Sequence, residues 1–308
     1  MNRTLPVCGN RGNPPISRIR PFFALLAAVF GLIAAPVPAL AQESLRFDSL
    51  DADIADGKPT GIEARLYKPA GSGPFPAIVA MHGCSGRDWT DGRMSSLYRD
   101  WAARLTGLGF VVLFPDSFKP RGVEEVCTRQ PQPVTPFRQR PRDAHGALAW
   151  LAAQPYVRAD RVFLIGWSHG GSTVLNSLDA GSRAPPRAPG NLAFRAAIAF
   201  YPGCLSPSRR RDWTAAAPLL ILIGELDDWT PAAPCEALAS RARGAGQPVE
   251  LVTYPGAYHS FDAVQGQLRQ RTDVGSKPGG SVTLGPEPVA REDARRRVAA
   301  FLLQHAGP

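Results

Sequence analysis

The stretch from Arg161 to Asn176, RVFLIGWSHGGSTVLN, constrains the fold of this chain more than any other. Its apolar run from Val162 to Ile165 has the length and the β-branched content of a buried strand, and helix-compatible residues resume at Ser172. The spacing G-x-S-x-G over residues 166–170 separates the two, and small residues there allow a sharp turn between strand and helix. This nucleophile elbow predicts Ser168 as the attacking residue. The alternative is a glycine-rich turn whose serine caps the helix.

Apolar runs of strand length alternate with helical patterns along the rest of the chain. The expected strands span Ile62 to Tyr67, Ala77 to Met81, Phe110 to Phe114, Phe194 to Tyr201, Leu219 to Ile223 and Val249 to Tyr254. The expected helices span Ser95 to Leu108, Asp143 to Ala153, Ala232 to Arg243 and Glu292 to Gln304. Residues from Gln42 to Lys58 are mostly polar and show no clear pattern. The first expected strand, Ile62 to Tyr67, alternates apolar with charged residues as an edge strand does. The pattern predicts an α/β fold with a mostly parallel, doubly wound sheet flanked by helices.

The first forty residues have the features of a secretory signal peptide and are left out of the fold prediction. Four arginines and no acid precede an apolar stretch from Phe22 to Ala35, and Ala39-Leu40-Ala41 offers a small-x-small cleavage site. We therefore expect residues 1–41 to be removed and residues 42–308 to form one α/β domain that is secreted or periplasmic. The apolar stretch is short for a membrane span, so no stable membrane anchor is expected, with an uncleaved anchor as the alternative.

Charge and cysteine content narrow the class of protein further. The formal net charge of +9 falls to +5 without the four arginines of the first segment, and the remaining basic residues are scattered among acids. Nucleic-acid binding is therefore not indicated. Four cysteines follow residue 41, an even number that suits an oxidising compartment. We favour pairing Cys84 with Cys127 and Cys204 with Cys235, because each bridge would tie a loop on the catalytic rim to the next long loop. Four buried thiols are the alternative.

A serine nucleophile needs a base, and the base needs an orienting acid, in the chain order Ser, then Asp or Glu, then His on this kind of fold. The loop after the expected strand from Leu219 to Ile223 reads GELDDWTP and carries three carboxylates. We expect Asp227 to orient the base. The adjacent Asp228 would point in a different direction and is the alternative, while Glu225 is expected to cap the loop.

The general base is expected in the loop after Val249 to Tyr254, which reads PGAYHSFD. Its His259 follows both Ser168 and an acid-bearing loop and lies at a strand end, whereas His305 lies near the end of the C-terminal helix. The alternative for His259 is a loop histidine without a catalytic role. The spacing of metal ligands is absent, and we expect neither a metal nor another cofactor.

The oxyanion of a tetrahedral intermediate needs backbone donors. We expect these to be the N–H of His169, the residue after the nucleophile, and the N–H of Cys84, in the glycine-rich loop after Ala77 to Met81. The side chain of His169 is expected to line the pocket. For His82, we favour a structural role bonded to the loop backbone over a pocket role. The possible pocket residues are His82, Trp167, Trp229 and Tyr258.

The sequence resembles the dienelactone hydrolase family of α/β-hydrolases, especially its exported members with a serine nucleophile. The matching segments are MHGCSG at Met81, FVVLFPDSF at Phe110, RPRDAHGALAWL at Arg140, GWSHGG at Gly166, FYPGC at Phe200, GELDDWTP at Gly224 and YPGAYHSFD at Tyr254. The resemblance implies an α/β-hydrolase fold, an acid-base-nucleophile triad and hydrolysis of an ester or lactone. It places the acid at Asp227, which opens D-x-x-x-P, and the base at His259 in H-x-F. Dienelactone hydrolases proper carry cysteine at the elbow, so Ser168 favours general esterase chemistry.

We therefore expect a serine hydrolase that cleaves small carboxylic esters or lactones through an acyl-enzyme on Ser168. The oligomeric state is not defined by the sequence. The alternatives are a peptidase or amidase on the same fold, which would usually carry an added propeller or lid domain, and a catalytically silent ligand-binding homologue. Residues Lys119 to Arg142 are proline-rich and basic, and they form either a solvated excursion or a cap over the pocket. Candidates for holding a substrate carboxylate are Arg87, Arg121, Arg138 and Arg140.

Overall fold

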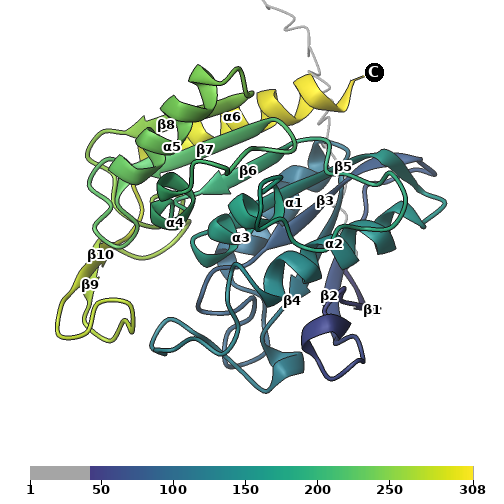
Figure 1. The fold of residues 1–308 in the computed structure, drawn as a ribbon, viewed down its shortest axis with the longest axis horizontal. Helices are drawn as coiled ribbons and strands as arrows, with labels where there is room; N and C mark the ends of the chain where they lie inside the picture. Colours follow the sequence, from purple (N-terminus) through teal and green to yellow (C-terminus); the bar gives the residue numbers. More distant parts are fainter. Residues whose placement is uncertain (1–41, 308) are drawn as a thin grey trace, which may run out of the picture. The chain divides into compact units, whose positions relative to one another are not determined.

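The computed structural model of the chain describes residues 42–307. The expected signal peptide, residues 1–41, lies outside the described residues. An eight-stranded sheet with the order β1-β2-β4-β3-β5-β6-β7-β8 organises the described part (Figure 1). Its strands are β1 (Gln42–Asp48), β2 (Gly61–Tyr67), β3 (Phe75–Met81), β4 (Val111–Asp116), β5 (Val157–Trp167), β6 (Ala197–Phe200), β7 (Leu219–Gly224) and β8 (Val249–Tyr254). The pairs β1 with β2 and β2 with β4 are antiparallel, and the other neighbours are parallel, as predicted.

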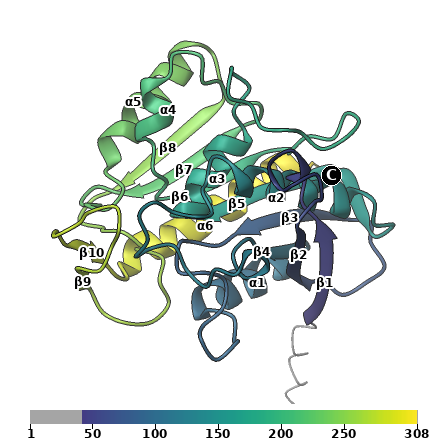
Figure 2. The same cartoon turned by 60° about the horizontal axis from the view of Figure 1, so that its bottom comes forward.

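Helices cover both faces of this sheet (Figure 2). They are α1 (Ser96–Gly107), α2 (Gln139–Ala152), α3 (His169–Ser177), α4 (Leu205–Arg209), α5 (Ala232–Gly244) and α6 (Pro288–Ala306), with short 3-10 turns η1 (Ala52–Ile54) and η2 (Lys119–Arg121). Helices α1 and α6 share one face, where Arg295 forms an ion pair with Asp100 at 2.7 Å. Helices α2, α3 and α5 cover the other face, as the two views agree. None of the helices among residues 42–307 combines the length and apolarity that a membrane crossing requires.

The central strands are buried on both sides, which explains their continuous apolar sequences. Strand β3 pairs with β4 on one side and with β5 on the other, and residues 77–81 have no measurable exposure. Parallel strands place their carboxyl ends along one edge of the sheet, so the loops after β3, β5, β7 and β8 converge there. This edge is where the candidate catalytic residues lie.

The fold differs from the sequence prediction at strand β1, at the start of helix α2, at helix α4, which was not expected, and at a hairpin. Strand β1 forms within the stretch read as polar and mixed, so β1 rather than β2 is the edge strand; among the residues of β1, only Phe47 is buried, which leaves a weak pattern. Helix α2 begins at Gln139, inside the proline-rich stretch that was expected to extend to Arg142. The two-stranded hairpin of β9 (Arg269–Arg271) and β10 (Val282–Leu284) was not predicted, because each strand has only three residues.

The structure contains two disulfides, Cys84 with Cys127 and Cys204 with Cys235, which is the pairing favoured from the sequence. The first joins the loop after β3 to the proline-rich excursion. Around it, the excursion buries Val123, Val126 and Val134 with Phe118 in a small core of its own. The excursion is therefore packed and covalently tethered rather than fully solvated.

Removal of the second disulfide should destabilise the fold. Cys204 and Cys235 are 31 residues apart, and the chain-entropy model assigns about 3–4 kcal/mol to a closed loop of this length. We expect the Cys204→Ser/Cys235→Ser variant to lose roughly that much free energy of unfolding in urea at 25 °C, because its unfolded chain gains conformational freedom. Wild-type protein with the bridges oxidised is the control, and equal unfolding midpoints would contradict this prediction.

Candidate active site

Ser168 lies on the turn between β5 and α3 in a backbone conformation that few residues adopt. Its φ and ψ are 54° and −113°, outside the regions favoured by L-residues. The turn is held from both sides, since the N–H of Ser168 donates to the carbonyl of Phe200 at 2.9 Å. A Cβ on Gly166 would overlap the carbonyl of Gly170, and a Cβ on Gly170 would overlap the carbonyl of Met81. The glycines of the motif are therefore required by backbone packing.

His259 and Asp227 complete a continuous polar chain with Ser168. The Oγ of Ser168 lies 2.9 Å from Nε2 of His259, and Nδ1 of the same ring lies 2.8 Å from Oδ2 of Asp227. Both His259 and Asp227 are buried, so water does not compete for this contact. The other carboxylate oxygen, Oδ1, accepts the N–H groups of Trp229 and Thr230 at 3.0 and 2.8 Å. The carboxylate is thereby fixed in the orientation that meets the imidazole.

The neighbouring carboxylates of the same loop face elsewhere. Asp228 accepts the backbone N–H of Thr283 at 2.7 Å and its hydroxyl at 3.1 Å, so it anchors the β9–β10 hairpin. Glu225 accepts the N–H of Gly256 at 3.3 Å, which joins the loops after β7 and β8. Of the three acids, Asp227 is the one in contact with His259.

The two backbone N–H groups expected to bind an oxyanion lie in the loops that flank Ser168. Within residues 42–307, neither the N–H of Cys84 nor that of His169 donates a hydrogen bond. The loop that carries Cys84 is held in place, because the hydroxyl of Tyr98 accepts the N–H of Gly83 at 2.7 Å and the carbonyl of Cys84 accepts the N–H of Val126 at 2.8 Å. Both donors are therefore free on otherwise fixed segments.

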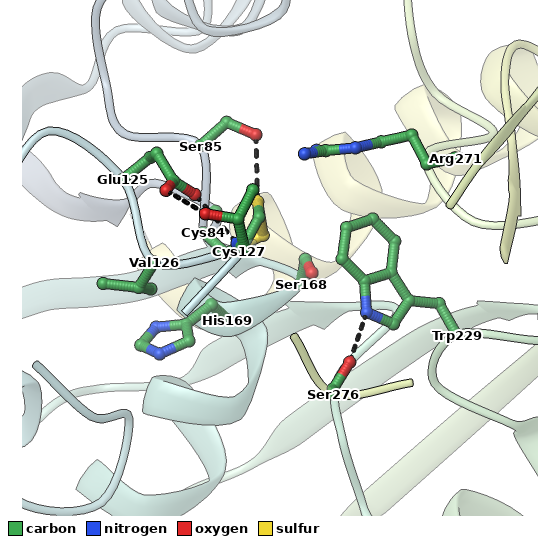
Figure 3. Close-up of a disulfide and its surroundings, with 12 residues drawn as sticks. Cys84, Ser85, Glu125, Val126, Cys127, Ser168, His169, Trp229, Arg271 and Ser276 are labelled. Carbon is green, nitrogen blue, oxygen red and sulfur yellow. Dashed lines mark hydrogen bonds between the residues drawn. A yellow bond between two sulfur atoms is a disulfide. The ribbon is translucent and has the colours of Figure 1, made fainter. Parts of the chain in front are cut away.

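Ser168 lies between the Cys84–Cys127 disulfide and the indole of Trp229, with Arg271 above that ring (Figure 3). A hollow of about 100 Å³ opens onto it. Its lining includes Gly83, Cys84, Ser85, Leu97, Tyr98, Trp167, Tyr201, Trp229, Ser260, Arg269, Arg271 and Leu284 beside Ser168 and His259. Arg269, Arg271 and Leu284 belong to the hairpin that sequence reasoning missed. The two strands of this hairpin are only three residues long, so the sequence shows no alternating apolar pattern from which they could be predicted.

Two of the four expected pocket residues, His82 and Tyr258, do not line the hollow. His82 is fully buried: its Nδ1 lies 2.8 Å from the carbonyl of Gly83, and its Nε2 accepts the N–H of Ser117 at 3.3 Å. It is a structural residue. Trp167 is largely buried but does line the hollow, whereas Tyr258 is not part of its lining. Trp229 does line it.

The arginines proposed for a substrate carboxylate do not line the hollow either. Arg87 bonds to Asp88, Arg121 bridges Asp51 and Asp143, and Arg138 is exposed on the excursion. These assignments were wrong because sequence proximity to a loop does not tell which way a long side chain turns. The remaining candidate, Arg140, is buried behind the site.

Arg140 joins the two segments that carry the candidate oxyanion donors. Its Nη2 donates to the carbonyl of His82 at 2.7 Å, and its Nη1 lies 2.6 Å from Nδ1 of His169. The guanidinium packs over the ring of Phe118 at 5.2 Å. Burial lowers the pKa of Arg140 to about 10, so it is cationic at neutral pH. Nε2 of His169 in turn lies 3.2 Å from the side-chain oxygen of Gln132.

A buried carboxylate, Asp262, supports the site from the opposite side. It accepts the indole N–H groups of Trp101 and Trp167, each at 2.9 Å, and the hydroxyl of Tyr201 at 2.7 Å. The ring of Tyr201 packs against that of His259 at 4.6 Å. Burial raises the pKa of Asp262, whereas its three donors favour the charged form. Thus the loop after β8 is tied to the elbow and to β6 through one side chain. Sequence reasoning did not assign Asp262 a role.

No group of three or more His, Cys, Asp or Glu side chains in residues 42–307 is arranged to hold a metal ion. The described side chains at this edge of the sheet bring together a serine hydroxyl, an imidazole and a carboxylate.

Comparison with known proteins gives concordant matches. The model described as "Dienelactone hydrolase family" matches residues 62–306. A Bradyrhizobium protein named "Probable 2-oxo-3-(5-oxofuran-2-ylidene)propanoate lactonase" is 26% identical over 212 residues, which cover 64% of this chain and 78% of that protein. A "Putative carboxymethylenebutenolidase" from Methylorubrum extorquens is 27% identical over 66% of this chain and 68% of its own length.

Two solved structures show the likeness in fold. A dienelactone hydrolase-like promiscuous phosphotriesterase from metagenomic libraries superposes with a TM-score of 0.61 at 20% identity, over 87% of this chain and all of its own. An esterase from Thermogutta terrifontis superposes with a TM-score of 0.59 at 18% identity, over 89% of this chain and 96% of its own.

The buried histidines should make the fold sensitive to mild acid. Burial, with Arg140 nearby, holds the pKa values of His82 and His169 well below 6.5, and burial lowers that of His145 to about 4. Below pH 6.5 the unfolded chain therefore binds more protons than the folded one, so this stability is present above pH 6.5 and is lost as the pH falls. We expect the free energy of unfolding to drop between pH 7.5 and 5 by about 1–2 kcal/mol per buried histidine.

Urea unfolding at the two pH values measures this drop. The variant His145→Leu should decline less steeply, since one titrating group is removed. A free energy of unfolding that stays constant down to pH 5 would show that these histidines are protonated in the folded state.

Proposed function

The chain belongs to the dienelactone hydrolase family, and from this starting point we propose that it hydrolyses small carboxylic esters or lactones through a Ser168-His259-Asp227 triad. The single observation that carries the proposal is the continuous contact of Ser168 Oγ, His259 and Asp227 at 2.9 and 2.8 Å, on a strained turn at the carboxyl edge of the sheet. A binding protein without catalysis does not require this register of three side chains from three separate loops.

In the proposed acylation step, Nε2 of His259 takes the hydroxyl proton of Ser168 while Oγ attacks the carbonyl carbon of the substrate. The carbonyl oxygen becomes an oxyanion, which the N–H groups of Cys84 and His169 stabilise. Asp227 holds the imidazole in the required tautomer and stabilises the imidazolium. The imidazolium then gives its proton to the departing alkoxide oxygen, the ester C–O bond breaks, and an acyl-enzyme remains on Ser168.

Deacylation uses the same groups in the reverse order. His259 takes a proton from water, whose oxygen attacks the acyl carbon, and the second oxyanion occupies the same donors. Collapse breaks the bond to Ser168, which recovers its proton from His259. For a lactone, the departing alkoxide stays attached to the acyl group, so the product is a hydroxy acid. The serine in place of the family's cysteine favours general esters over dienelactone alone.

We also propose that the protein works outside the cytoplasm. The four cysteines in the described residues form two disulfides, and such bonds persist in the periplasm or outside the cell but are rare in reducing compartments. Residues 1–41, with their basic, apolar and small-residue segments, would supply the export signal.

The two adjacent aspartates offer a matched test of the triad. We expect Asp227→Asn to lower kcat on p-nitrophenyl acetate by about 10³–10⁴-fold, since loss of the orienting acid leaves the imidazole in the wrong tautomer. Asp228→Asn retains an acceptor for Thr283 and should stay near the wild-type rate. Ser168→Ala should be inactive on the same ester and on small lactones.

Steady-state assays on purified, disulfide-intact variants measure these rates. The reverse pattern for the two aspartates would move the orienting role to Asp228. A folded wild-type protein that hydrolyses neither short esters nor lactones would overturn the proposed function.

A further inference from the structure

A second hollow, which we call the outer chamber, lies next to the hollow at Ser168. It has a volume of about 430 Å³, and its lining includes Trp89, Leu97, Tyr98, Val264, Leu284 and Pro286. The outer chamber and the hollow at Ser168 share Ser85, Leu97, Tyr98, Ser260, Arg269 and Leu284 as walls. They are therefore neighbouring compartments of one cleft.

Apolar side chains form much of the wall of the outer chamber, beside four serines, two glutamines and Arg269. Its volume falls within the roughly 300–1,000 Å³ of small-molecule sites. The acid in its wall, Asp88, is already neutralised by ion pairs with Arg65 at 3.1 Å and Arg87 at 2.8 Å. Trp89 keeps 53% of its surface exposed at the rim, although large aromatic side chains usually gain from burial. An apolar ligand would cover this ring.

A third hollow, which also borders Ser168, offers less room than the outer chamber. Its volume is about 190 Å³, and its lining includes the Cys84–Cys127 disulfide, Gln132 and Trp229. The disulfide ties the excursion down at this hollow, so the wall cannot easily retreat. The two arms of an ester bound at Ser168 would therefore meet spaces of unequal size.

We propose that the outer chamber binds a large apolar arm of the substrate, either an aryl group or a medium-length alkyl chain, while the 190 Å³ hollow beside the Cys84–Cys127 disulfide holds the short arm. The inference rests on the proposed function and narrows its substrate class to asymmetric esters. Each methylene group that moves from water into the chamber should raise kcat/KM by up to about fourfold until the chamber is filled.

A substitution that places a larger side chain between the two compartments tests this inference. Leu97 is half-buried near the start of α1 and lines both compartments, so Leu97→Trp should narrow the passage between them. Two substrate series are needed: p-nitrophenyl esters from acetate to octanoate, and acetates of alcohols from ethanol to 2-naphthol. We expect wild-type kcat/KM to rise with arm size in one series, and Leu97→Trp to lose at least about tenfold more on the large members of that series than on its smallest member. Leu303→Trp, on an exposed position of α6, is the control.

Trp89→Ala gives a second readout that does not depend on how Leu97→Trp folds, because Trp89 is on an exposed loop. It should raise KM for the large substrates and leave kcat unchanged. The inference would be overturned if wild-type kcat/KM did not change with arm size in either series. It would also be overturned if kcat/KM depended on arm size in the same way in Leu97→Trp and Leu303→Trp. Loss of all hydrolysis in the wild type would instead refute the proposed function.

A separate observation concerns Arg140, a cation buried without an ion-pair partner among residues 42–307. It bonds to the carbonyl of His82, two residues before Cys84, and to the ring of His169, the residue after Ser168. We infer that Arg140 is a positioning residue: it sets the spacing of the two N–H groups that bind the oxyanion. Its charge behind these donors also favours the developing negative charge.

Replacement of Arg140 should affect the chemical step rather than substrate binding. Folded Arg140→Met should lose at least about tenfold in kcat, with KM within threefold, and should be phosphonylated more slowly in proportion. Arg140→Lys keeps the positive charge but not the two-pronged guanidinium that contacts both segments, and its kcat should fall less than that of Arg140→Met. Gln132→Ala, in the excursion, frees the far side of the His169 ring and also removes a bond to the carbonyl of Val126; in folded protein it should lower kcat by about two- to fivefold. Unchanged kcat in folded Arg140→Met, or in Gln132→Ala where Arg140 variants do not fold, would overturn this role.

Discussion

The close approach of backbone segments at the turn between β5 and α3 is the constraint on which the rest of the site depends. Helix α3 begins directly against the ends of β3 and β6: a Cβ on Gly170 would overlap the carbonyl of Met81, and one on Gly171 would lie 2.5 Å from the carbonyl of Phe200. This packing offsets the conformational strain of the positive φ at Ser168 and fixes its hydroxyl at the edge of the sheet. The loops after β7 and β8 need only reach the same edge to bring an acid and a base to it.

Buried polar groups then fix the segments that meet at this edge. Arg140 connects the loop after β3 to the start of α3, and Asp262 connects the loop after β8 to the elbow, to α1 and to β6. Asp228 fastens the hairpin that closes the cleft. Removed from water, each of these contacts is sensitive to geometry, because an unpaired buried group is costly. Such anchoring is what a site built on loops requires to keep its catalytic groups in register.

The sequence predicted the fold class, the parallel core of the sheet and the residues that meet at Ser168, because these carry local signals. A buried strand is a continuous apolar run, the elbow has a fixed glycine spacing, and Asp227 and His259 follow strands in the expected order. Strand β1 and the hairpin escaped prediction because their stability comes from partners distant in sequence, such as β2 for β1 and Asp228 for the hairpin. For the same reason, the directions of Arg87 and Arg121, and the contacts of Arg140 and Asp262, became visible only in three dimensions.

The central claim is that Ser168 is an activated nucleophile, and labelling with a fluorophosphonate tests it most directly. Peptide mapping by mass spectrometry should find one adduct, on Ser168, that is absent in Ser168→Ala and forms far more slowly in His259→Ala, since the base is needed to remove the hydroxyl proton. A folded, disulfide-intact protein that acquires no adduct, or acquires it on another residue, would contradict this account.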